Sequence, residues 1–323
     1  MKVLITGAGG FLGTEVTKQL ALKGEYEIHT LSRNEYPHLN QYVSKQIQFD
    51  LSSNHELNVV LNEQYDAIFH IAGKVAMWGP WNDFVQTNIE ATKKICEYAQ
   101  STKVKYLVYT SSPSVVFGNE SIKGSNEEMS YPKKHYGMYG KSKRMAEEWI
   151  LGQDWNFQMV ALRPHLILGK GEKNLIPNII EKSRKGLLKI VGDGENRVDI
   201  IDVRNAAEAH LCALESMINN PTLTNEAFFL GQGPVKIWEF INQILIKKGE
   251  NKIDKKVSFK VAYLAGSIFE IIYKVLNIKD KEPPMTRFVA LQLNKDHFFD
   301  HQKASNLLNW KPKYSIDELL EVI

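Results

Sequence analysis

The chain is short of cysteine and has no clear excess of charge of either sign. Its 323 residues include two cysteines, Cys96 and Cys212, in separate helix-like stretches, so no disulfide framework is indicated and a reducing compartment is expected. The 40 basic and 37 acidic residues leave a net charge of +3, which argues against a nucleic-acid partner. An apolar run begins almost at residue 1, which leaves no room for a signal peptide. The sequence therefore predicts a cytoplasmic protein.

Long uninterrupted hydrophobic segments are also missing. Residues 257–278 come nearest, but Lys260, Glu270 and Lys274 interrupt them, so a free-standing membrane span is not expected. Two alternatives remain for this segment. It is either a buried helix of a substrate-binding lobe, or an apolar lip that admits a lipid-like substrate and makes a peripheral membrane contact.

Glycines at the spaced positions 7, 10 and 13 lie between the first apolar run, Val3 to Ile5, and a helical pattern from Thr14 to Leu22. Glycine lets the backbone approach a phosphate, and a helix that follows presents free N–H groups and the positive end of its dipole. The Lys-Ser/Thr pair of a P-loop is missing. A glycine-rich turn alone is weak evidence, but this context predicts a dinucleotide site. The predicted phosphate-binding residues are Gly7, Gly10, Phe11, Leu12 and Gly13.

The end of the second expected strand indicates which dinucleotide is bound. NAD enzymes usually place an acidic residue there to bind the ribose 2′-hydroxyl, whereas this chain has Ser32 and Arg33. A guanidinium pairs with phosphate through two hydrogen bonds, so NADP(H) is favoured over NAD(H). A solvated surface arginine is the alternative. Asp50 and Leu51, after the third strand, are placed to meet the adenine edge or to form a plain turn.

Tyr139 and Lys143 form the only Tyr-x-x-x-Lys pair in the chain. Chance alone could supply one such pair, so its context has to decide. Residues four apart share a helix face, and both side chains can therefore enter one site or merely lie on a surface. A free tyrosine titrates near pH ~10. An adjacent ammonium is expected to lower the pKa of Tyr139, which would then exchange a proton with a substrate oxygen.

A serine cluster follows the expected buried strand 104–110. Ser111, Ser112 and Ser114 stand there, and ligands of open α/β sheets bind at the carboxyl ends of the strands. A hydroxyl from this cluster is therefore well placed to hydrogen-bond a substrate carbonyl.

Short apolar segments alternate with helical ones to about residue 165, which predicts an α/β fold with a doubly wound parallel (Rossmann) sheet. The expected strands are 2–6, 26–31, 46–49, 66–71, 104–110, 157–163 and 227–230. The later sequence is mostly helical. We predict a dinucleotide-binding domain from 1–165 and about 196–235, and a smaller substrate lobe from about 166–195 and 236–323.

Taken together, these motifs resemble those of the extended short-chain dehydrogenases/reductases, in the NAD-dependent epimerase/dehydratase superfamily. Trp78-Gly79-Pro80-Trp81 and Arg163-Pro164-His165 are similar to the 3β-hydroxysteroid dehydrogenase/isomerase-like group, above all to its bacterial 2-alkyl-3-oxoalkanoate reductases. The resemblance runs almost end to end. It implies an NAD(P)-dependent oxidoreductase that interconverts 3-keto and 3-hydroxy groups on a hydrophobic small molecule, either a 2-alkyl-3-oxo acid or a sterol-like substrate. It also implies a homodimer.

The resemblance assigns roles to individual residues. Ser112 takes the place of the catalytic serine, Tyr139 that of the acid/base and Lys143 that of the supporting cation, with Asn88 on a helix beside them. Further cofactor contacts are implied for Ile71, Ala72, Gly73, Lys143, Pro164 and His165. Substrate contacts are implied for Trp78, Trp81, Ser114 and Arg287, although either tryptophan could instead be core packing. Gly73 stands where the family pattern has alanine.

Other functions remain open at this stage. A nucleotide-sugar epimerase or dehydratase uses the same Ser/Tyr/Lys set but needs a second nucleotide site, for which the apolar segment 257–278 is unsuited. A redox sensor that binds a dinucleotide without turnover has no need to keep both Tyr139 and Lys143. His297 and His301 have a metal-ligand spacing on a helix, but the phenylalanines between them indicate strand or core, and no metal site is expected.

Overall fold

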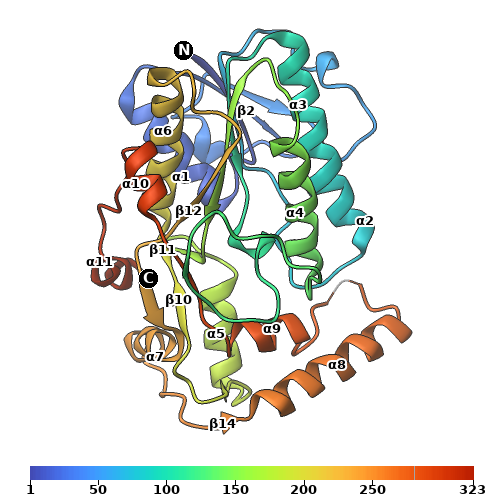
Figure 1. Cartoon of the computed structure of the whole chain (residues 1–323), viewed down its shortest axis with the longest axis vertical. Helices are drawn as coiled ribbons and strands as arrows, with labels where there is room; N and C mark the ends of the chain where they lie inside the picture. The colour runs from blue at the N-terminus through green and yellow to red at the C-terminus, as the bar shows by residue number, and fades with distance from the viewer. Residues whose placement is uncertain (280) are drawn as a thin grey trace.

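Seven parallel strands form the main sheet, in the spatial order β12-β7-β5-β4-β1-β2-β3 (Figure 1). The computed structural model describes residues 1–279 and 281–323. The strands of this sheet are β1 (Lys2–Thr6), β2 (Glu27–Ser32), β3 (Lys45–Gln48), β4 (Ala67–His70), β5 (Tyr106–Thr110), β7 (Gln158–Pro164) and β12 (Glu226–Leu230). They agree with the expected strands to within two residues, so the predicted doubly wound α/β fold is confirmed.

Helices cover both faces of this sheet, which explains why its strands are apolar runs rather than alternating patterns. α1 (Phe11–Lys23) and α6 (Val203–Asn219) share a core with one face, and α3 (Ala91–Thr102) and α4 (Met138–Leu151) with the other (Figure 1). β1 pairs with β2 on one side and with β4 on the other. The chain connections therefore diverge between β1 and β4, and this reversal creates a ligand crevice at the carboxyl ends of the strands.

A smaller part of the molecule lies below that edge. Its four-stranded sheet has the order β13-β10-β15-β6, formed by β13 (Pro234–Lys236), β10 (Arg197–Asp199), β15 (His297–Phe299) and β6 (Ile122–Ser125). Two short strand pairs join β8 (Ile167–Leu168) to β11 (Ile201–Asp202), and β9 (Ile190–Val191) to β14 (Lys256–Val257). The helices here are α5 (Leu175–Arg184), α7 (Ile237–Lys247), α8 (Phe259–Val275), α9 (Arg287–Gln292) and α11 (Ile316–Val322). α10 (Gln302–Leu307) instead packs on β12 of the main sheet. Because the small sheet takes strands from both predicted parts, the division into two lobes stays a prediction.

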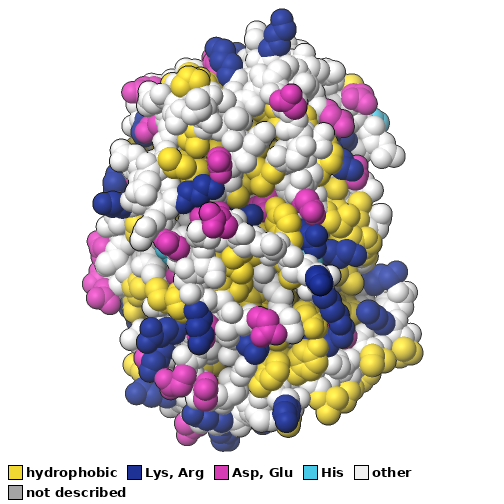
Figure 2. All heavy atoms as spheres, in the orientation of Figure 1, with side chains coloured by type: hydrophobic (Ala, Val, Ile, Leu, Met, Phe, Trp, Pro, Cys, Tyr) yellow, Lys and Arg dark blue, Asp and Glu magenta, His cyan; other side chains and the backbone are white. Residues whose placement is uncertain are grey.

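Helix α8 corrects the prediction that residues 257–278 form a buried helix. The helix is present, but the residues that it buries are Ala262, Gly266 and Glu270, whereas its large aliphatic side chains face solvent. Figure 2 shows hydrophobic side chains along the lower right edge of the molecule, where α8 lies in Figure 1. Small residues face inward because α8 packs close to α9. Among the described residues, no helix has the length and apolar character needed to cross a membrane.

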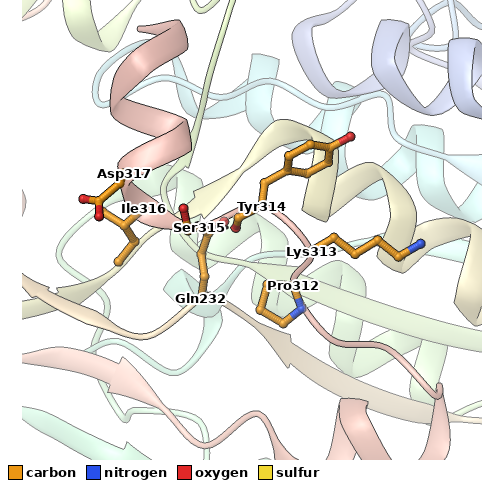
Figure 3. Close-up of a pocket in the computed structure, with 7 residues that line it drawn as sticks. All are labelled: Gln232, Pro312, Lys313, Tyr314, Ser315, Ile316 and Asp317. Carbon is orange, nitrogen blue, oxygen red and sulfur yellow. Dashed lines mark hydrogen bonds between the residues drawn. The ribbon is translucent and has the colours of Figure 1, made fainter.

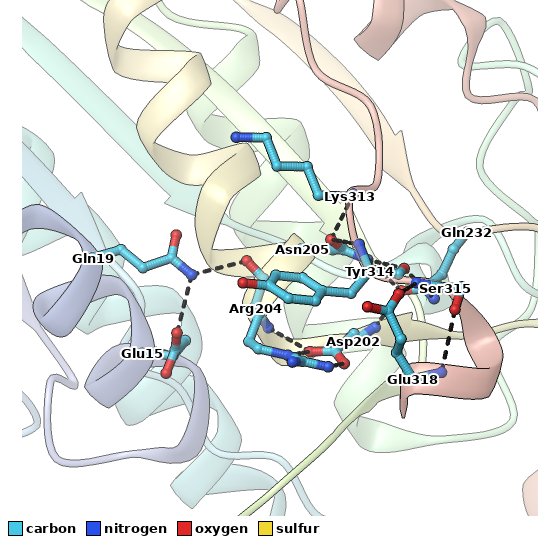
Figure 4. A network of polar contacts seen from close by, with 10 residues as sticks. All are labelled: Glu15, Gln19, Asp202, Arg204, Asn205, Gln232, Lys313, Tyr314, Ser315 and Glu318. Carbon is cyan, nitrogen blue, oxygen red and sulfur yellow. Dashed lines mark hydrogen bonds and ion pairs between the residues drawn. The ribbon is translucent and has the colours of Figure 1, made fainter. Parts of the chain in front are cut away.

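The end of the chain returns to the larger half and is fastened at the start of α6. The Asn205 side-chain oxygen accepts hydrogen bonds from the backbone N–H groups of Lys313 and Tyr314, at 2.9 and 3.0 Å, and its amide donates to the Tyr314 carbonyl at 2.8 Å. Figure 4 shows this network, which Gln19 extends to α1 by donating to the Arg204 carbonyl. A shallow pocket of about 330 Å³ opens beside it (Figure 3). Its position beside the returning segment sets it apart from the crevice at the β1 and β4 ends.

Candidate active site

The glycine loop lies between β1 and α1 and is shaped by close backbone contacts. A Cβ atom on Gly7, whose φ is +74°, would lie 2.7 Å from the Ala72 nitrogen, and one on Gly13 would lie 2.2 Å from the Gly7 carbonyl oxygen. Within the part of the chain that the structure describes, no side chain caps the first turn of α1. Its N–H groups are therefore free to bind an anion. The loop fits a dinucleotide diphosphate on these grounds.

Tyr36 covers the same loop, although it was not among the predicted site residues. A Cβ atom on Gly9 would lie 2.1 Å from the Tyr36 ring, so the middle glycine is required by an aromatic side chain rather than by a phosphate. Gln46 holds Tyr36 in place, since its side chain accepts from the Tyr36 N–H at 2.9 Å and donates to the Tyr36 carbonyl at 3.0 Å.

Ser32 ends β2, and Arg33 follows it with an exposed side chain. Asp50 lies nearby on the next loop. Burial raises the pKa of Asp50, but hydrogen bonds from the Ser52 hydroxyl and N–H, with the nearby Arg33 charge, outweigh it and lower that pKa overall. Leu51 lines a shallow pocket of about 410 Å³ between this loop and α3. The structure thus brings together the four residues predicted to meet the adenosine end of a dinucleotide.

Tyr139 and Lys143 lie one turn apart in α4, as the spacing predicts. Lys143 is only 3% exposed, and its ammonium donates to the Thr110 carbonyl at 2.8 Å and lies 3.4 Å from the Tyr109 hydroxyl. The carboxyl end of β5 therefore fixes the position of this cation. Ile71 and Ala72 follow β4 on the neighbouring strand, where the Thr6 hydroxyl accepts from the Ala72 N–H at 3.2 Å.

The pKa values of this pair depend mainly on burial. Burial lowers the pKa of Lys143 to about 8, against a smaller opposing effect of the Glu147 carboxylate. Burial also raises the pKa of Tyr139, and a hydrogen bond with the Ser112 side chain acts in the opposite direction. The direction for Tyr139 is the reverse of that expected from the adjacent ammonium, because burial of the phenol has the larger effect. In this state, Tyr139 is a proton donor at neutral pH.

Ser112 and Ser114 stand beside Tyr139 through an unusually close contact. A Cβ atom on Gly140 would lie 2.8 Å from the Ser114 carbonyl oxygen, so only glycine lets α4 approach this turn so closely. The Ser112 hydroxyl accepts from the Ser114 N–H at 3.2 Å and donates to the Ser114 hydroxyl at 3.2 Å. Both serines are candidates for the oxygen-binding hydroxyl, and Ser112 is the one that lowers the pKa of Tyr139.

Asn88 is fully buried in a π-helical turn, η3 (Val85–Glu90), a deviation that is frequent at functional sites. Its side chain accepts from the Lys74 N–H at 2.7 Å and donates to the Lys74 carbonyl at 3.1 Å and the Ser142 hydroxyl at 2.8 Å. A Cβ atom on Gly73 would lie 3.2 Å from the Lys143 nitrogen and 3.3 Å from the Asn88 side-chain oxygen. An alanine at position 73 would therefore require the Lys143 or the Asn88 side chain to shift by a few tenths of an ångström.

Arg163, named above only as part of a resemblance motif, lies on β7 and binds α4 through Glu147. Its guanidinium donates two hydrogen bonds to the Glu147 carboxylate, at 3.0 and 2.7 Å, and both side chains are buried. The Tyr131 hydroxyl donates to the same carboxylate at 2.9 Å. Glu147 was missed, although its i+8 spacing from Tyr139 on one helix face was a visible clue.

Pro164 and His165 end β7, where the predicted cofactor contact continues into a histidine pair. His165 Nε2 lies 2.6 Å from His297 Nδ1, and His297 Nε2 lies 2.9 Å from the Gln292 carbonyl. Burial lowers the pKa of His297 to about 4 and holds the pKa of His165 well below its ordinary value, so both rings are neutral. The Gln292 carbonyl only accepts hydrogen bonds, so the neutral His297 ring carries its proton on Nε2 and its Nδ1 is an acceptor. His165 must then donate to that Nδ1 from its Nε2, which leaves His165 Nδ1 without a proton and able to accept. His301 pairs instead with Asp199 at 3.0 Å.

The other predicted substrate residues lie at the edge of the site. The Trp78 indole donates to the Ile278 carbonyl at 3.0 Å, which ties its loop to the end of α8. Trp81 packs on the core beneath α3 and α4, with the Lys141 ammonium 4.6 Å from its ring. The Arg287 guanidinium is occupied by Glu270, through hydrogen bonds of 2.9 and 2.6 Å. Trp78 and Arg287 thus both contact α8 or the segment that follows it, whereas Trp81 lies in the core.

Known proteins are similar to this chain over almost its full length. The 3-beta hydroxysteroid dehydrogenase/isomerase family matches residues 4–261. The chain is 35% identical to a 2-alkyl-3-oxoalkanoate reductase of Stenotrophomonas maltophilia (strain K279a), with 98% of this chain and 97% of the relative covered. It is 27% identical to the Mus musculus sterol-4-alpha-carboxylate 3-dehydrogenase, decarboxylating, with 99% and 89% covered. A UDP-glucuronic acid 4-epimerase from Bacillus cereus, solved in complex with NAD, shares the fold at a TM-score of 0.74 and 21% identity, with 100% and 97% covered.

Proposed function

Since the chain belongs to the 3-beta hydroxysteroid dehydrogenase/isomerase family, and is an NAD(P)-dependent oxidoreductase of the extended short-chain type, we propose that it interconverts the 3-oxo and 3-hydroxy groups of a hydrophobic 2-alkyl-3-oxo acid. The observation that carries this proposal is the 35% identity with a 2-alkyl-3-oxoalkanoate reductase over 98% of the chain. The substrate class comes from that relative, and the chemistry from the convergence of Ser112, Tyr139 and Lys143 at one edge of the sheet.

The residues of the chain divide the chemistry between them. A nicotinamide dinucleotide held by Gly7, Gly10 and the first turn of α1 supplies the hydride when bound. Tyr139 donates its phenolic proton to the 3-oxo oxygen, which becomes the hydroxyl oxygen. The Ser112 hydroxyl donates a hydrogen bond to the same oxygen and fixes its position. The Lys143 ammonium, anchored on the Thr110 carbonyl, stabilises the phenolate that Tyr139 leaves behind.

We further propose a preference for NADP(H). Arg33 is exposed directly after β2, where a guanidinium can pair with a 2′-phosphate. Ser32 adds a hydroxyl at the same strand end. The nearby Asp50 carboxylate lowers the local positive charge but is itself engaged by Ser52 at 2.9 and 2.6 Å, which leaves the Arg33 side chain available for a phosphate.

The test is oxidation of a 2-alkyl-3-hydroxy acid and of a 3β-hydroxysteroid by the purified protein, with NADP+ and with NAD+, followed by the absorbance of the reduced nicotinamide. We expect turnover of the acid with NADP+ and its loss in Tyr139→Phe. Turnover of the steroid alone would overturn the substrate class and keep the catalytic set. A dinucleotide that copurifies tightly, without net turnover of either compound, would instead favour an epimerase.

Two further properties are proposed. A homodimer, paired through the helices near residues 81–100 and 137–151, rests on the resemblance alone. A cytoplasmic location rests on the two separate cysteines, which fit a reducing compartment. Sedimentation velocity tests the first, and fractionation of the source cells tests the second. A monomer at all protein concentrations contradicts the dimer.

A further inference from the structure

Helix α8 carries its apolar residues on the outside. Val261, Leu264, Ile268, Ile271, Ile272 and Val275 are between 41% and 77% exposed. Their spacing of three and four residues places them on one face of the helix, opposite the inward Ala262, Gly266 and Glu270. Scattered exposed apolar residues need no explanation, but a contiguous stripe of this kind marks an interaction surface.

The exposed charges of α8 are of one sign. Lys260 and Lys274 are exposed on this helix, and residues 252–282 carry an excess of positive charge, with seven lysines against four acidic residues. The one acidic residue of α8, Glu270, is buried and neutralised by Arg287, whose guanidinium lies 2.6 Å away. An apolar face with a basic flank complements an anionic, apolar surface, which is the chemistry of a bilayer that contains acidic lipids.

The same charges disfavour a second copy of the chain as the occupant. If two copies met through this face with their α8 helices antiparallel, Lys260 of one helix would lie near Lys274 of the other, and the reverse. The α8 sequence has no exposed acidic residue to offset that repulsion. Headgroups of acidic lipids, by contrast, bind each of these ammonium groups.

The inner face of α8 leads directly to the catalytic helix. A Cβ atom on Gly266 would lie 2.5 Å from the Thr286 carbonyl carbon, and the Phe288 ring packs 3.1 Å from the corresponding point on Gly137, two residues before Tyr139. The Tyr263 ring meets the Tyr136 ring edge-on, with their centres 6.3 Å apart. A single layer of side chains therefore lies between the inner face of α8 and the start of α4, while the apolar stripe lies on the outer face of the same helix.

We propose that the outer face of α8 docks on the surface of an anionic bilayer, so that its inner face and the start of α4 lie on the side away from the lipid. The docking does not rest on the proposed function. No part of the chain needs to cross the membrane. The six aliphatic side chains enter the boundary between headgroups and acyl chains while the lysines stay at the headgroup level.

Vesicle flotation of the full chain tests the docking. Vesicles of phosphatidylcholine alone are compared with vesicles of equal parts phosphatidylcholine and phosphatidylglycerol. We expect binding to the second kind, weakened by salt. The double variant Leu264→Ser/Ile268→Ser should lose at least about tenfold in partition, and Lys260→Gln and Lys274→Gln about fivefold each. Leu22→Ser and Val59→Ser, at apolar residues elsewhere that are even more exposed than Leu264 and Ile268, and Lys105→Gln should bind as the wild type does.

Several results would overturn the docking. They are no binding of the wild type to either vesicle, equal losses in the Leu22→Ser and Val59→Ser controls, or a dimer that dissociates in Leu264→Ser/Ile268→Ser, which would assign the face to a second copy. Thermal unfolding of each variant confirms that it is folded. Turnover then separates the two proposals. Oxidation of a short, water-soluble 3-hydroxy acid without vesicle binding would support the proposed function and contradict the membrane docking. Vesicle binding without any turnover would support the docking and contradict the proposed function.

Discussion

Arg163 and Glu147 form a two-point ion pair inside the protein, with nitrogen–oxygen distances of 3.0 and 2.7 Å and side chains that are 4% and 0% exposed. Glu147 lies one turn beyond Lys143 and two turns beyond Tyr139 on α4, and Arg163 lies on β7. The pair thus fixes the rotation of α4 about its own axis, which determines where the Tyr139 and Lys143 side chains point.

We expect Glu147→Gln to destabilise the fold by about 3–5 kcal/mol, because it leaves the buried guanidinium without its counter-charge. Glu148→Gln is the matched control on the same helix, since its ion pair with Arg144 is on the surface, where Glu148 is 53% exposed, and surface pairs contribute about 0–1 kcal/mol. Urea unfolding measures both. Equal effects of the two substitutions would show that the buried pair does not fix α4.

The pKa of Lys143 predicts a pH dependence of reduction. Because burial lowers this pKa to about 8, the ammonium loses its proton as the pH rises through 8, and the phenolate of Tyr139 loses its stabilising charge. We expect kcat/KM for reduction to fall above pH 8. Lys143→Arg keeps a positive charge over this range, so its profile should lack that fall even if its maximum is lower. A fall that persists at the same pH in Lys143→Arg would assign it to another group.

Removal of the Tyr139 hydroxyl should affect the chemistry rather than the binding. Tyr139→Phe is expected to lower kcat by about 10²–10⁴-fold, the usual contribution of a positioned acid. Its dinucleotide affinity, measured by fluorescence titration, should stay within about twofold because phosphate is bound by the glycine loop. Tyr106→Phe, at the far end of β5, should retain full activity. A Tyr139→Phe enzyme that turns over normally would exclude this tyrosine as the acid.

Gly73→Ala tests the space around Lys143. The added methyl group would lie 3.2 Å from the lysine nitrogen and 3.3 Å from the Asn88 side-chain oxygen, and small displacements of catalytic groups are costly. We expect kcat to drop about tenfold or more with little change in thermal stability. Gly152→Ala is a matched control, because its methyl group would meet the Glu148 carbonyl at a similar 3.1 Å away from the site. Full activity in Gly73→Ala would mean that the lysine moves aside freely.

Arg33→Gln tests the choice of dinucleotide. Loss of a charge-assisted contact with the 2′-phosphate is expected to weaken NADP+ binding about tenfold or more, while NAD+, which has no such phosphate, should bind as before. Isothermal titration with both dinucleotides measures the ratio. Arg184→Gln removes another exposed arginine, from α5, and should leave the ratio unchanged. Parallel losses for both dinucleotides in Arg33→Gln would indicate a general rather than a phosphate-specific role.

The main sheet and the outline of the site could be predicted because they depend on local sequence. Strands buried on both faces are continuous apolar runs, and the turn between β1 and α1 needs glycines at fixed positions. Tyr139 and Lys143 lie on one helix, so a spacing of four suffices to place them together.

Contacts between distant segments could not be predicted in this way. His165 and His297 stand 132 residues apart, and nothing local indicates that their rings meet. Glu147 has the appearance of a surface acid until Arg163 is placed opposite it. For α8, the sequence established an apolar helix but not which side faces the protein, and the small residues Ala262 and Gly266 proved to be the buried ones.

The fastening of the C-terminal segment to Asn205 has a consequence for the order of folding. The start of α6 packs on the main sheet, yet the fully buried Asn205 obtains three of its side-chain hydrogen bonds from residues 313 and 314, besides the one that it donates to Gln232. Until residues 313 and 314 pack there, the Asn205 side chain keeps water as a partner, because burying it without these hydrogen bonds is unfavourable. The start of α6 therefore reaches its final state only after residues 313 and 314 have been made, although its own sequence emerges first.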